Sequence, residues 1–101
     1  MDQLVNLTLI KITETVDDIG EPAKTETSVT IRGTKQSVTR DEWFSAYKAD
    51  IQAKYRIKVY EFEYHDEPEA ILNGERLAIY RTFYNGGDYI ELYLGKKGGV
   101  Q

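Results

Sequence analysis

The residues best suited to chemistry form an acidic run around the only histidine of the chain: Glu61, Glu63, His65, Asp66 and Glu67. One histidine together with carboxylates could hold a hard cation. The spacing, however, matches neither an EF-hand loop nor a zinc-binding motif. We therefore interpret the run as a solvated acidic turn before Pro68, and we expect neither a metal nor another cofactor.

Catalytic groups are scarce elsewhere in the chain. The carboxylate pairs at 17–18 and 41–42 could serve as general acid and base, but adjacent carboxylates are ordinary in turns and helix caps. One histidine, no cysteine and no Gly-x-Ser-x-Gly motif leave almost no candidate for nucleophilic catalysis. The glycine pairs at 86–87 and 98–99 lack the strand–loop–helix context of a phosphate-binding loop. The sequence therefore predicts a protein that is not an enzyme.

Length and composition indicate one modest domain. The 101 residues suffice for a single core, and the absence of cysteine excludes disulfides and favours a reducing cytosol. No apolar run approaches the roughly 18 residues of a membrane span, and the start of the chain lacks the positive region of a cleavable signal. The net charge of −4, from 13 basic and 17 acidic residues, argues against a reader of duplex DNA.

Two long strands are expected before any helix. β-Branched residues mark strands over 4–16 and 25–38, on either side of a dense turn cluster at 17–22. Together they are predicted to form a hairpin, in which Gly33 is consistent with a bulge.

The hydrophobic period then changes to that of a helix. Thr39 and Glu42 match a capping box, in which the Glu42 side chain reaches back to the cap. Apolar residues follow at helical spacing, namely Trp43, Phe44, Tyr47 and Ile51. We predict a single helix over about 40–53, seated on the sheet by its three aromatic residues. The alternative is that this aromatic segment rearranges when a partner arrives.

The next strand changes phase once. Its first half places apolar residues opposite basic ones, namely Tyr55, Ile57 and Val59 against Lys54, Arg56 and Lys58. After Val59 the apolar side shifts to Tyr60, Phe62 and Tyr64, with Glu61 and Glu63 facing away. A slip of one residue is typical of a β-bulge or of a strand that turns the corner of a small barrel.

Two further hairpins complete the predicted sheet. Asn73-Gly74 is a strong turn signal and joins strands over 69–72 and 75–84. The last hairpin turns at Gly86-Gly87 or over the four residues 85–88, with the expected pairs Tyr84–Tyr89, Phe83–Ile90, Thr82–Glu91, Arg81–Leu92, Tyr80–Tyr93 and Ile79–Leu94. In this register the core face consists of Leu77, Ile79, Phe83, Ile90, Leu92 and Leu94. Arg81 is its one polar member, which must find a carboxylate or reach the end of the barrel.

These elements predict a mainly β protein, a small antiparallel barrel or sandwich of about six strands with one helix inserted near 40–53. Residues 1–95 form the single β-barrel domain, and 96–101 are expected to be a mobile tail.

The second face of the last hairpin indicates an interface. It carries Tyr80, Tyr84, Tyr89 and Tyr93, which is more aromatic surface than a solvated hairpin needs. Stacking of single-stranded nucleic acid on this face is an alternative, as in OB-type barrels. Against it, the face offers carboxylates and no basic groove, because Lys96 and Lys97 are the only close basic pair.

Opposite charges also separate along the chain. The basic group Lys54, Arg56 and Lys58 precedes an acidic group that begins with Glu61 and Glu63. Head-to-tail contacts between unlike surfaces build closed rings, so we expect self-association into a ring through these surfaces.

Four stretches in order resemble the head–tail joining (head-closure or head-completion) proteins of long-tailed phages and prophages: ETVDDIGEPAKTETSVT, SVTRDEWFSA, YRIKVYEFEY and ILNGERLAIYRTFYNGGDYIELYLGKKGGV. The resemblance covers nearly the whole chain. Its most specific part is Asn73-Gly74, followed by 79–82, by 90–94 and by the Lys/Gly-rich tail. The ordered series carries the resemblance, since no single motif is diagnostic.

The resemblance implies a structural protein of the virion. Such proteins are small β-barrels that add as a ring beneath the portal and its adaptor after DNA packaging. They close the channel and present the surface on which the tail docks. Members can be monomeric alone and form a dodecameric ring on the connector, and in some a long loop projects inward as a stopper. Here the 33–54 connection, with Trp43, Phe44 and Tyr47, is the positional candidate for that loop.

The partners implied are the portal and adaptor proteins and the tail-terminator protein. Packaged DNA would pass through without sequence-specific binding, and no membrane is involved. The location implied is the virion, preceded by the cytoplasm of the bacterial host. The alternative function is an OB-like nucleic-acid-binding module or another small adaptor.

Overall fold

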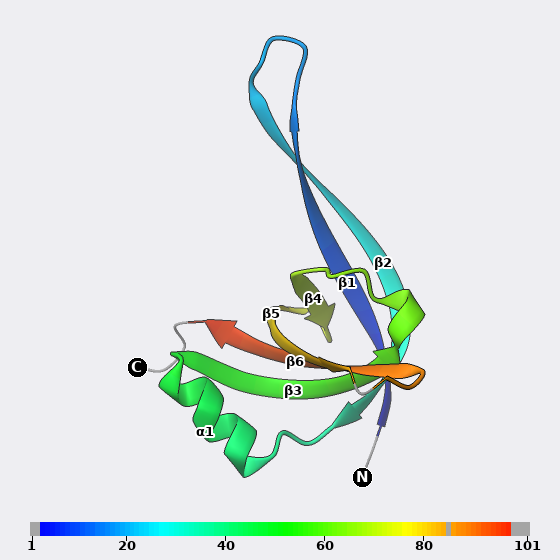
Figure 1. The fold of residues 1–101 in the computed structure, drawn as a ribbon, viewed down its shortest axis with the longest axis vertical. Helices are drawn as coiled ribbons and strands as arrows, with labels where there is room; N and C mark the ends of the chain where they lie inside the picture. Colours follow the sequence, from blue (N-terminus) through cyan, green and yellow to red (C-terminus); the bar gives the residue numbers. More distant parts are fainter. Residues whose placement is uncertain (1–2, 85, 98–101) are drawn as a thin grey trace.

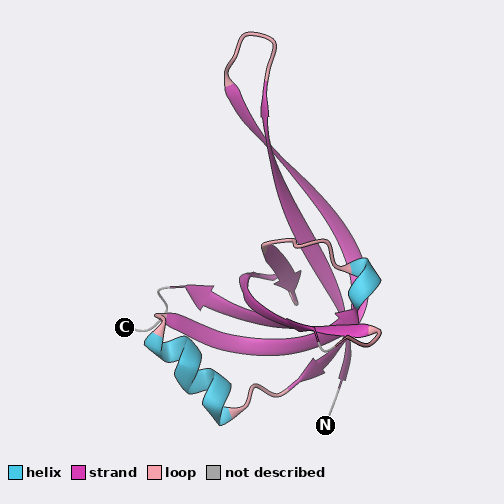
Figure 2. Ribbon diagram, viewed as in Figure 1, coloured by secondary structure: helices cyan, strands magenta, loops and turns pink. Residues whose placement is uncertain are grey.

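Six antiparallel strands close into a barrel with one α-helix beside it (Figure 1; Figure 2). The computed structural model describes residues 3–84 and 86–97. The elements in chain order are β1 (Gln3–Val16), β2 (Pro22–Gln36), α1 (Arg40–Lys48), β3 (Ile51–Tyr60), the 3-10 helix η1 (Glu61–Glu63), β4 (Glu69–Leu72), β5 (Glu75–Tyr84) and β6 (Tyr89–Lys97). Around the barrel the order is β1-β2-β3-β6-β5-β4. The predicted fold class, a mainly β barrel with one inserted helix, is confirmed.

Alternating residues from all six strands fill the barrel. The largest fully buried side chains are Leu7, Leu9, Ile57, Val59, Leu72, Leu77, Leu92 and Leu94. Burying each of them stabilises the fold by roughly 1.5–3 kcal/mol relative to leaving it in water. Among the described residues the cluster that fills the barrel is apolar, whereas the polar contacts described below lie on its outer surface.

Gly33 has a packing role in place of the expected bulge. β1 and β2 pair without interruption from Gln3–Lys35 to Val16–Pro22, so no residue is inserted at Gly33. A Cβ atom at this position would lie 2.6 Å from Cγ2 of Ile57 and 2.8 Å from Cγ1 of Val59. The glycine therefore lets β2 lie close to β3 just before the two strands begin to pair at Thr34.

β1 and β2 continue beyond the barrel as a projecting two-stranded ribbon, which we call the arm (residues 11–28; Figure 1). All of its residues are exposed, and it accounts for the long axis of the molecule, whose extents are 51 × 35 × 27 Å. At its tip the Asp17 carboxylate accepts hydrogen bonds from the amides of Ile19 (3.1 Å) and Glu21 (2.8 Å). The predicted hairpin is confirmed, but its departure from the barrel was not predicted.

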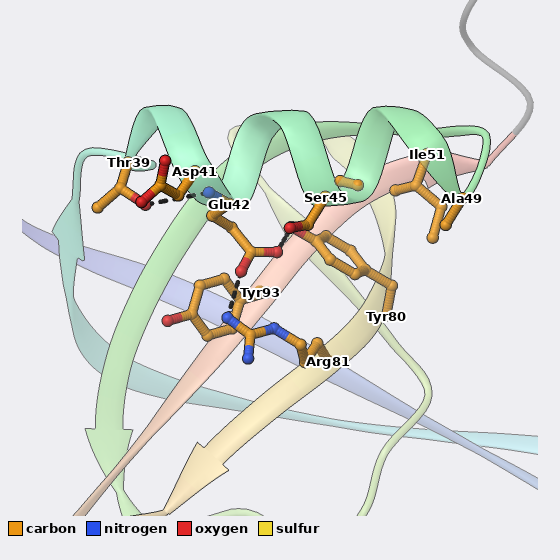
Figure 3. A pocket seen from close by; sticks show the side chains of 10 residues that line it. Thr39, Asp41, Glu42, Ser45, Ala49, Ile51, Tyr80, Arg81 and Tyr93 are labelled. Atoms are coloured by element: carbon orange, nitrogen blue, oxygen red, sulfur yellow. Dashed lines mark hydrogen bonds and ion pairs between the residues drawn. The ribbon is translucent and has the colours of Figure 1, made fainter.

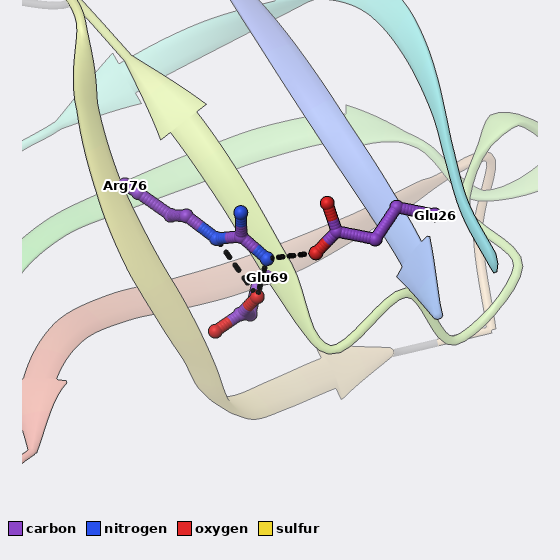
Figure 4. Close-up of polar contacts among 3 residues, drawn as sticks. All are labelled: Glu26, Glu69 and Arg76. Atoms are coloured by element: carbon purple, nitrogen blue, oxygen red, sulfur yellow. Dashed lines mark hydrogen bonds and ion pairs between the residues drawn. The ribbon is translucent and has the colours of Figure 1, made fainter. Parts of the chain in front are cut away.

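Arg76 of β5 bridges the base of the arm to the barrel (Figure 4). Its Nη2 lies 2.6 Å from Oε1 of Glu26 in β2, and its Nε lies 3.0 Å from Oε1 of Glu69 in β4. All three side chains are partly exposed, so this network contributes modestly to stability.

The helix is shorter than predicted. It ends at Lys48 instead of 53, and Ile51 belongs to β3. The amides of Ala49 and Asp50 bond back to the last helical turn, and Asp50 adopts a left-handed conformation with φ of 62°. That conformation turns the chain out of the helix and into the strand, because it cannot continue a right-handed helix.

The prediction that the strand continues past Val59 with a shift of one residue was wrong. β3 ends at Tyr60, and the following residues form η1 instead of a bulged strand. The bulge in this strand lies at its other end, where the pairing with β6 shifts between Ala53 and Tyr55.

The Asn73-Gly74 hairpin is as predicted, with both residues at positive φ between β4 and β5. The register of the last hairpin differs from the prediction. Of the predicted pairs only Ile79–Leu94 is present, because Tyr80 is an extra residue in β5 that has no partner in the register. The pairs beyond it are shifted by one residue and are Arg81–Tyr93, Thr82–Leu92, Phe83–Glu91 and Tyr84–Ile90. Phe83 is consequently exposed instead of lying in the core.

Two residues of the expected tail belong to the last strand. Lys96 and Lys97 pair with Gln52 and Ile51, so both belong to β6. The rest of the predicted tail, 98–101, lies outside the described residues.

Candidate functional site

A polar joint holds α1 against the outside of the barrel (Figure 3). Glu42 is only 8% exposed, and its carboxylate forms an ion pair with Arg81 and accepts a hydrogen bond of 2.8 Å from the Tyr80 hydroxyl. The Arg81 guanidinium also lies 4.2 Å from the centre of the Tyr93 ring, a cation–π contact. Arg81 is therefore paired with a carboxylate, which is one of the two outcomes expected from the sequence.

Burial under the helix changes the tyrosines of this joint. Desolvation, reinforced by the hydrogen bond to Glu42, raises the pKa of Tyr80 well above its usual value. Desolvation together with the hydrogen bond to Glu91 (3.0 Å) raises the pKa of Tyr93. Both hydroxyls are therefore held neutral, as expected of groups with a structural role.

A cavity of about 560 Å³ lies beside this joint, between α1 and the strands below it. Thr39, Asp41, Ser45, Ile51 and the residues of the joint line it (Figure 3). Its buried carboxylate is already bonded to an arginine and a hydroxyl, and the lining residues include no histidine. A second carboxylate, Asp41, lies beside Thr39 (Figure 3). The bonds of Glu42 hold the helix in place.

The capping box is only half formed. The Thr39 hydroxyl accepts a hydrogen bond of 3.2 Å from the Glu42 amide, as predicted. The Glu42 carboxylate does not return to the cap, because it is directed into the joint.

The aromatic residues of α1 point outward, contrary to the prediction that they seat the helix. Trp43, Phe44 and Tyr47 are 43–51% exposed, whereas Glu42 and Ala46 form the buried side. We call these three residues the helix aromatic face. The Trp43 ring stacks on Tyr47 at 5.4 Å and meets Phe44 edge-on at 5.3 Å. The small Ala46 allows a close approach to the barrel, and Arg81 supplies the partner for Glu42.

A second exposed cluster, the β3-end cluster, consists of Tyr60, Phe62 and Tyr89. The Tyr60 ring lies 4.8 Å from that of Tyr89 and 5.4 Å from that of Phe62. The Lys58 ammonium lies 4.9 Å from the centre of the Tyr89 ring. The hydrogen bond with Tyr89 raises the pKa of Tyr60, and the charges of Asp88 and Glu63 add to this effect.

The structure divides the four tyrosines that were predicted to form one interface. Tyr93 is 6% exposed and Tyr80 is half-buried, both next to α1. Tyr84 and Tyr89 remain exposed near the turn of the hairpin. The turn end of this hairpin is therefore its more exposed part.

The charged interface candidates are also dispersed. Arg56 is half-buried beside the Tyr93 hydroxyl, and Lys58 shares a hollow with Glu63 instead of lying apart from the acidic group. Lys96 lies 3.7 Å from Glu75. Lys54 is half-buried and Glu61 is exposed. Lys97 ends β6, and its side chain lies outside the described part of the structure.

The acidic run around His65 forms a structured turn. Glu67 is buried, and its carboxylate accepts a hydrogen bond of 2.6 Å from the His65 amide. The Tyr64 hydroxyl donates to the Glu67 carbonyl at 3.0 Å, and burial raises the pKa of Tyr64 to about 12. Within the described residues no group of three or more His, Asp and Glu side chains is placed to hold a metal ion.

Comparisons with known proteins leave the family open, since no family model matches the chain and no curated protein matches it significantly. Neither α1 nor any other helix in the described part of the chain has the length and apolar character to span a membrane.

Proposed function

We propose that this chain is a structural protein of the head–tail connector of a long-tailed phage or prophage. In this role it closes the portal channel after DNA packaging and forms the surface on which the tail docks. The proposal starts from the ordered resemblance that runs over nearly the whole sequence. A small β-barrel without a catalytic constellation in its described residues is compatible with this role.

The observation that carries the proposal is the excess of exposed aromatic surface. Eight of the twelve aromatic residues are more than two-fifths exposed: Trp43, Phe44, Tyr47, Tyr60, Phe62, Phe83, Tyr84 and Tyr89. A monomeric protein gains nothing from so many half-covered rings, which are typical of surfaces that meet other proteins. Assembly into a ring between the portal adaptor and the tail would cover them.

The arm is a better candidate than 33–54 for a segment that projects into the channel. Most of 33–54 is taken up by β2, α1 and β3, whereas the arm leaves the barrel with all its residues exposed (Figure 1). The arm carries five carboxylates and two lysines. A surface of that charge repels phosphates, so it would obstruct DNA without holding it tightly.

The partners in this proposal are the portal and adaptor proteins on one side and the tail-terminator protein on the other. Copies of the chain associate with one another in a ring on the connector. The chain resides in the host cytoplasm before assembly and in the virion afterwards.

Deletion of the gene in the phage or prophage that encodes it tests the proposal. Electron microscopy of the lysate should show DNA-filled heads and free tails that remain unjoined. Complementation with the wild-type chain should restore complete particles, which controls for effects on neighbouring genes. Normal infectious particles from the deletion would refute the assignment.

Single-stranded nucleic-acid binding is the second candidate, and the Lys58–Tyr89 contact favours it. A base could stack on the exposed Tyr60 or Tyr89 ring while the lysine meets a phosphate. Titration of the protein with single-stranded DNA at several salt concentrations separates the two functions. Tight binding with a steep salt dependence would favour this candidate over the connector.

A further inference from the structure

Two exposed aromatic surfaces lie at opposite ends of β3. The helix aromatic face belongs to α1, which ends just before Ile51 at the start of β3, and the β3-end cluster begins at Tyr60. The ten residues of β3 span roughly 30 Å at a rise of about 3.3 Å per residue. One copy of the chain therefore cannot bring these two surfaces together.

The charges around the two surfaces differ in balance. Arg40 and Lys48 lie one turn before and one turn after Phe44 on α1, and Asp41 is the one exposed carboxylate between them. Around the β3-end cluster stand Glu61, Glu63 and Asp88. Within the described residues Arg40, Lys48, Glu61, Glu63 and Asp88 form no ion pair.

Each of the two surfaces borders a hollow of about 440 Å³. Trp43 and Phe44 stand exposed at the edge of one, and the β3-end cluster lies at the edge of the other. Leu4, Phe62 and Tyr89 line the hollow of the β3-end cluster together with Glu63. Arg32 and Lys58 also line it, but the Lys58 ammonium is held over the Tyr89 ring. A projecting indole or phenyl ring fits such a hollow.

We propose that the helix aromatic face of one copy packs into the hollow of the β3-end cluster of a second copy. Arg40 and Lys48 then face Glu61, Glu63 and Asp88 across the contact. The two surfaces differ, so the contact is heterologous and repeats from copy to copy until a ring closes. This inference rests on the proposed function, for which it identifies the contact between neighbouring copies.

The size of the contact predicts that it is weak in isolation. A fully covered aromatic side chain buries about 150–250 Å², so six rings that are roughly half exposed cover on the order of 600 Å². Stable protein–protein interfaces bury about 1,200 Å² or more. The free chain should therefore be mostly monomeric at low concentration, and the contact should persist where the connector holds many copies together.

Paired cysteines test the contact directly, because the chain has no native cysteine. Phe44→Cys and Phe62→Cys alter exposed positions on the two surfaces. The double variant, treated with a short bifunctional maleimide, should give a ladder of linked dimers, trimers and larger species. Each single variant can link only two copies, and far-ultraviolet circular dichroism checks that all three remain folded. The measurement uses assembled particles and also concentrated purified protein.

Charge reversal gives a second readout that leaves the core untouched. In the double-cysteine background, Arg40→Glu with Lys48→Glu should lower the yield of the ladder at least tenfold. Adding Glu61→Lys with Glu63→Lys should restore it. The matched control is Lys11→Glu with Lys24→Glu on the arm, which changes the net charge equally and should leave the ladder intact.

The outcomes separate this inference from the proposed function. A ladder that depends on both cysteines and on the charge match supports the contact. Incorporation into particles without a ladder refutes the contact and leaves the connector function standing. If particles form normally without the protein, the connector function fails, and cross-linking of the purified chain still decides whether the contact exists. Absence of the ladder in both preparations overturns the inference.

Discussion

The two ends of the β5–β6 hairpin carry the same residue type in very different surroundings. At one end, Tyr80 and Tyr93 lie next to α1, and Arg81 is held between the Tyr93 ring and Glu42. At the other end, Tyr84 and Tyr89 are exposed, and Tyr89 contacts only Lys58 and its neighbour Tyr60 among the ring contacts described.

The difference shows what burial of a polar aromatic residue requires. A tyrosine can leave water only if its hydroxyl finds a partner, and Glu42 and Glu91 supply those partners at the covered end. At the turn end none of the described elements covers Tyr84 or Tyr89 to the same degree. The covered tyrosines therefore stabilise the fold, whereas the exposed ones are free to contact a partner.

Tyr93→Ala against Tyr89→Ala is the strongest test of this contrast. Tyr93→Ala should lower the free energy of unfolding by about 3 kcal/mol, because it removes a buried ring from beneath Arg81. Tyr89→Ala removes a ring that is 41% exposed and should cost less than about 1 kcal/mol. Urea denaturation followed by fluorescence measures both. Equal losses would abolish the distinction between the two ends.

Arg81→Ala should have the next largest effect, about 2 kcal/mol. It leaves the Glu42 carboxylate buried without its charge partner. The loss is smaller than for a fully buried ion pair, because Arg81 is half exposed and water can reach the site. A double-mutant cycle with Glu42→Gln measures the coupling between the two side chains. A coupling energy near zero would mean that the ion pair does not hold α1 on the barrel.

Thr39→Ala should destabilise the helix by about 1 kcal/mol, because it removes the side chain that caps the Glu42 amide. Thr39→Ser keeps the hydroxyl and serves as the matched control. Circular dichroism during denaturation reports the loss. If the serine variant lost as much as the alanine variant, the cap would not be the cause.

Alkaline pH should lower the free energy of unfolding through the tyrosines of the covered end. This effect should be the smallest of the four predicted here. The pKa values of Tyr80 and Tyr93 are raised in the folded state above the ordinary value of 10.0, chiefly by burial. Their contribution to stability is therefore complete below pH 10 and is lost as the pH rises toward the folded values. Tyr64, with a pKa of about 12, acts in the same direction.

Denaturation midpoints measured between about pH 9 and 11 test this expectation. The wild-type midpoint should fall with rising pH, and the fall should be shallower in Tyr80→Phe and Tyr93→Phe. A midpoint independent of pH over this range would contradict the expectation.

Local sequence signals predicted local structure well. Asn73-Gly74 encodes its turn through two residues that accept positive φ, and Thr39 marks the helix start through its hydroxyl. Together with the alternating strands, they were sufficient for the fold class and for most element boundaries.

Features that depend on distant partners were not predictable in the same way. Glu42 and Arg81 are separated by 39 positions, so no local pattern shows that the helix buries its glutamate and exposes its aromatic residues. Tyr80 is an extra residue in β5, and its insertion shifts the register of every later pair in the hairpin. Its hydroxyl likewise bonds to that helix. Local periodicity cannot detect either contact.

The arm has a mechanical consequence. β1 and β2 run without interruption from its tip into the barrel, so a force applied at the tip travels along both strands to the base. Among the described residues, β1 pairs with β4 through Thr8, Leu9 and Ile10 near that base, and β2 pairs with β3 through Thr34, Lys35 and Gln36 at the end of the strand farthest from the arm. These two short seams are the weakest places along that path. Pulling or pushing on the tip would part the barrel there first, while the four strands β3-β6-β5-β4 stay together.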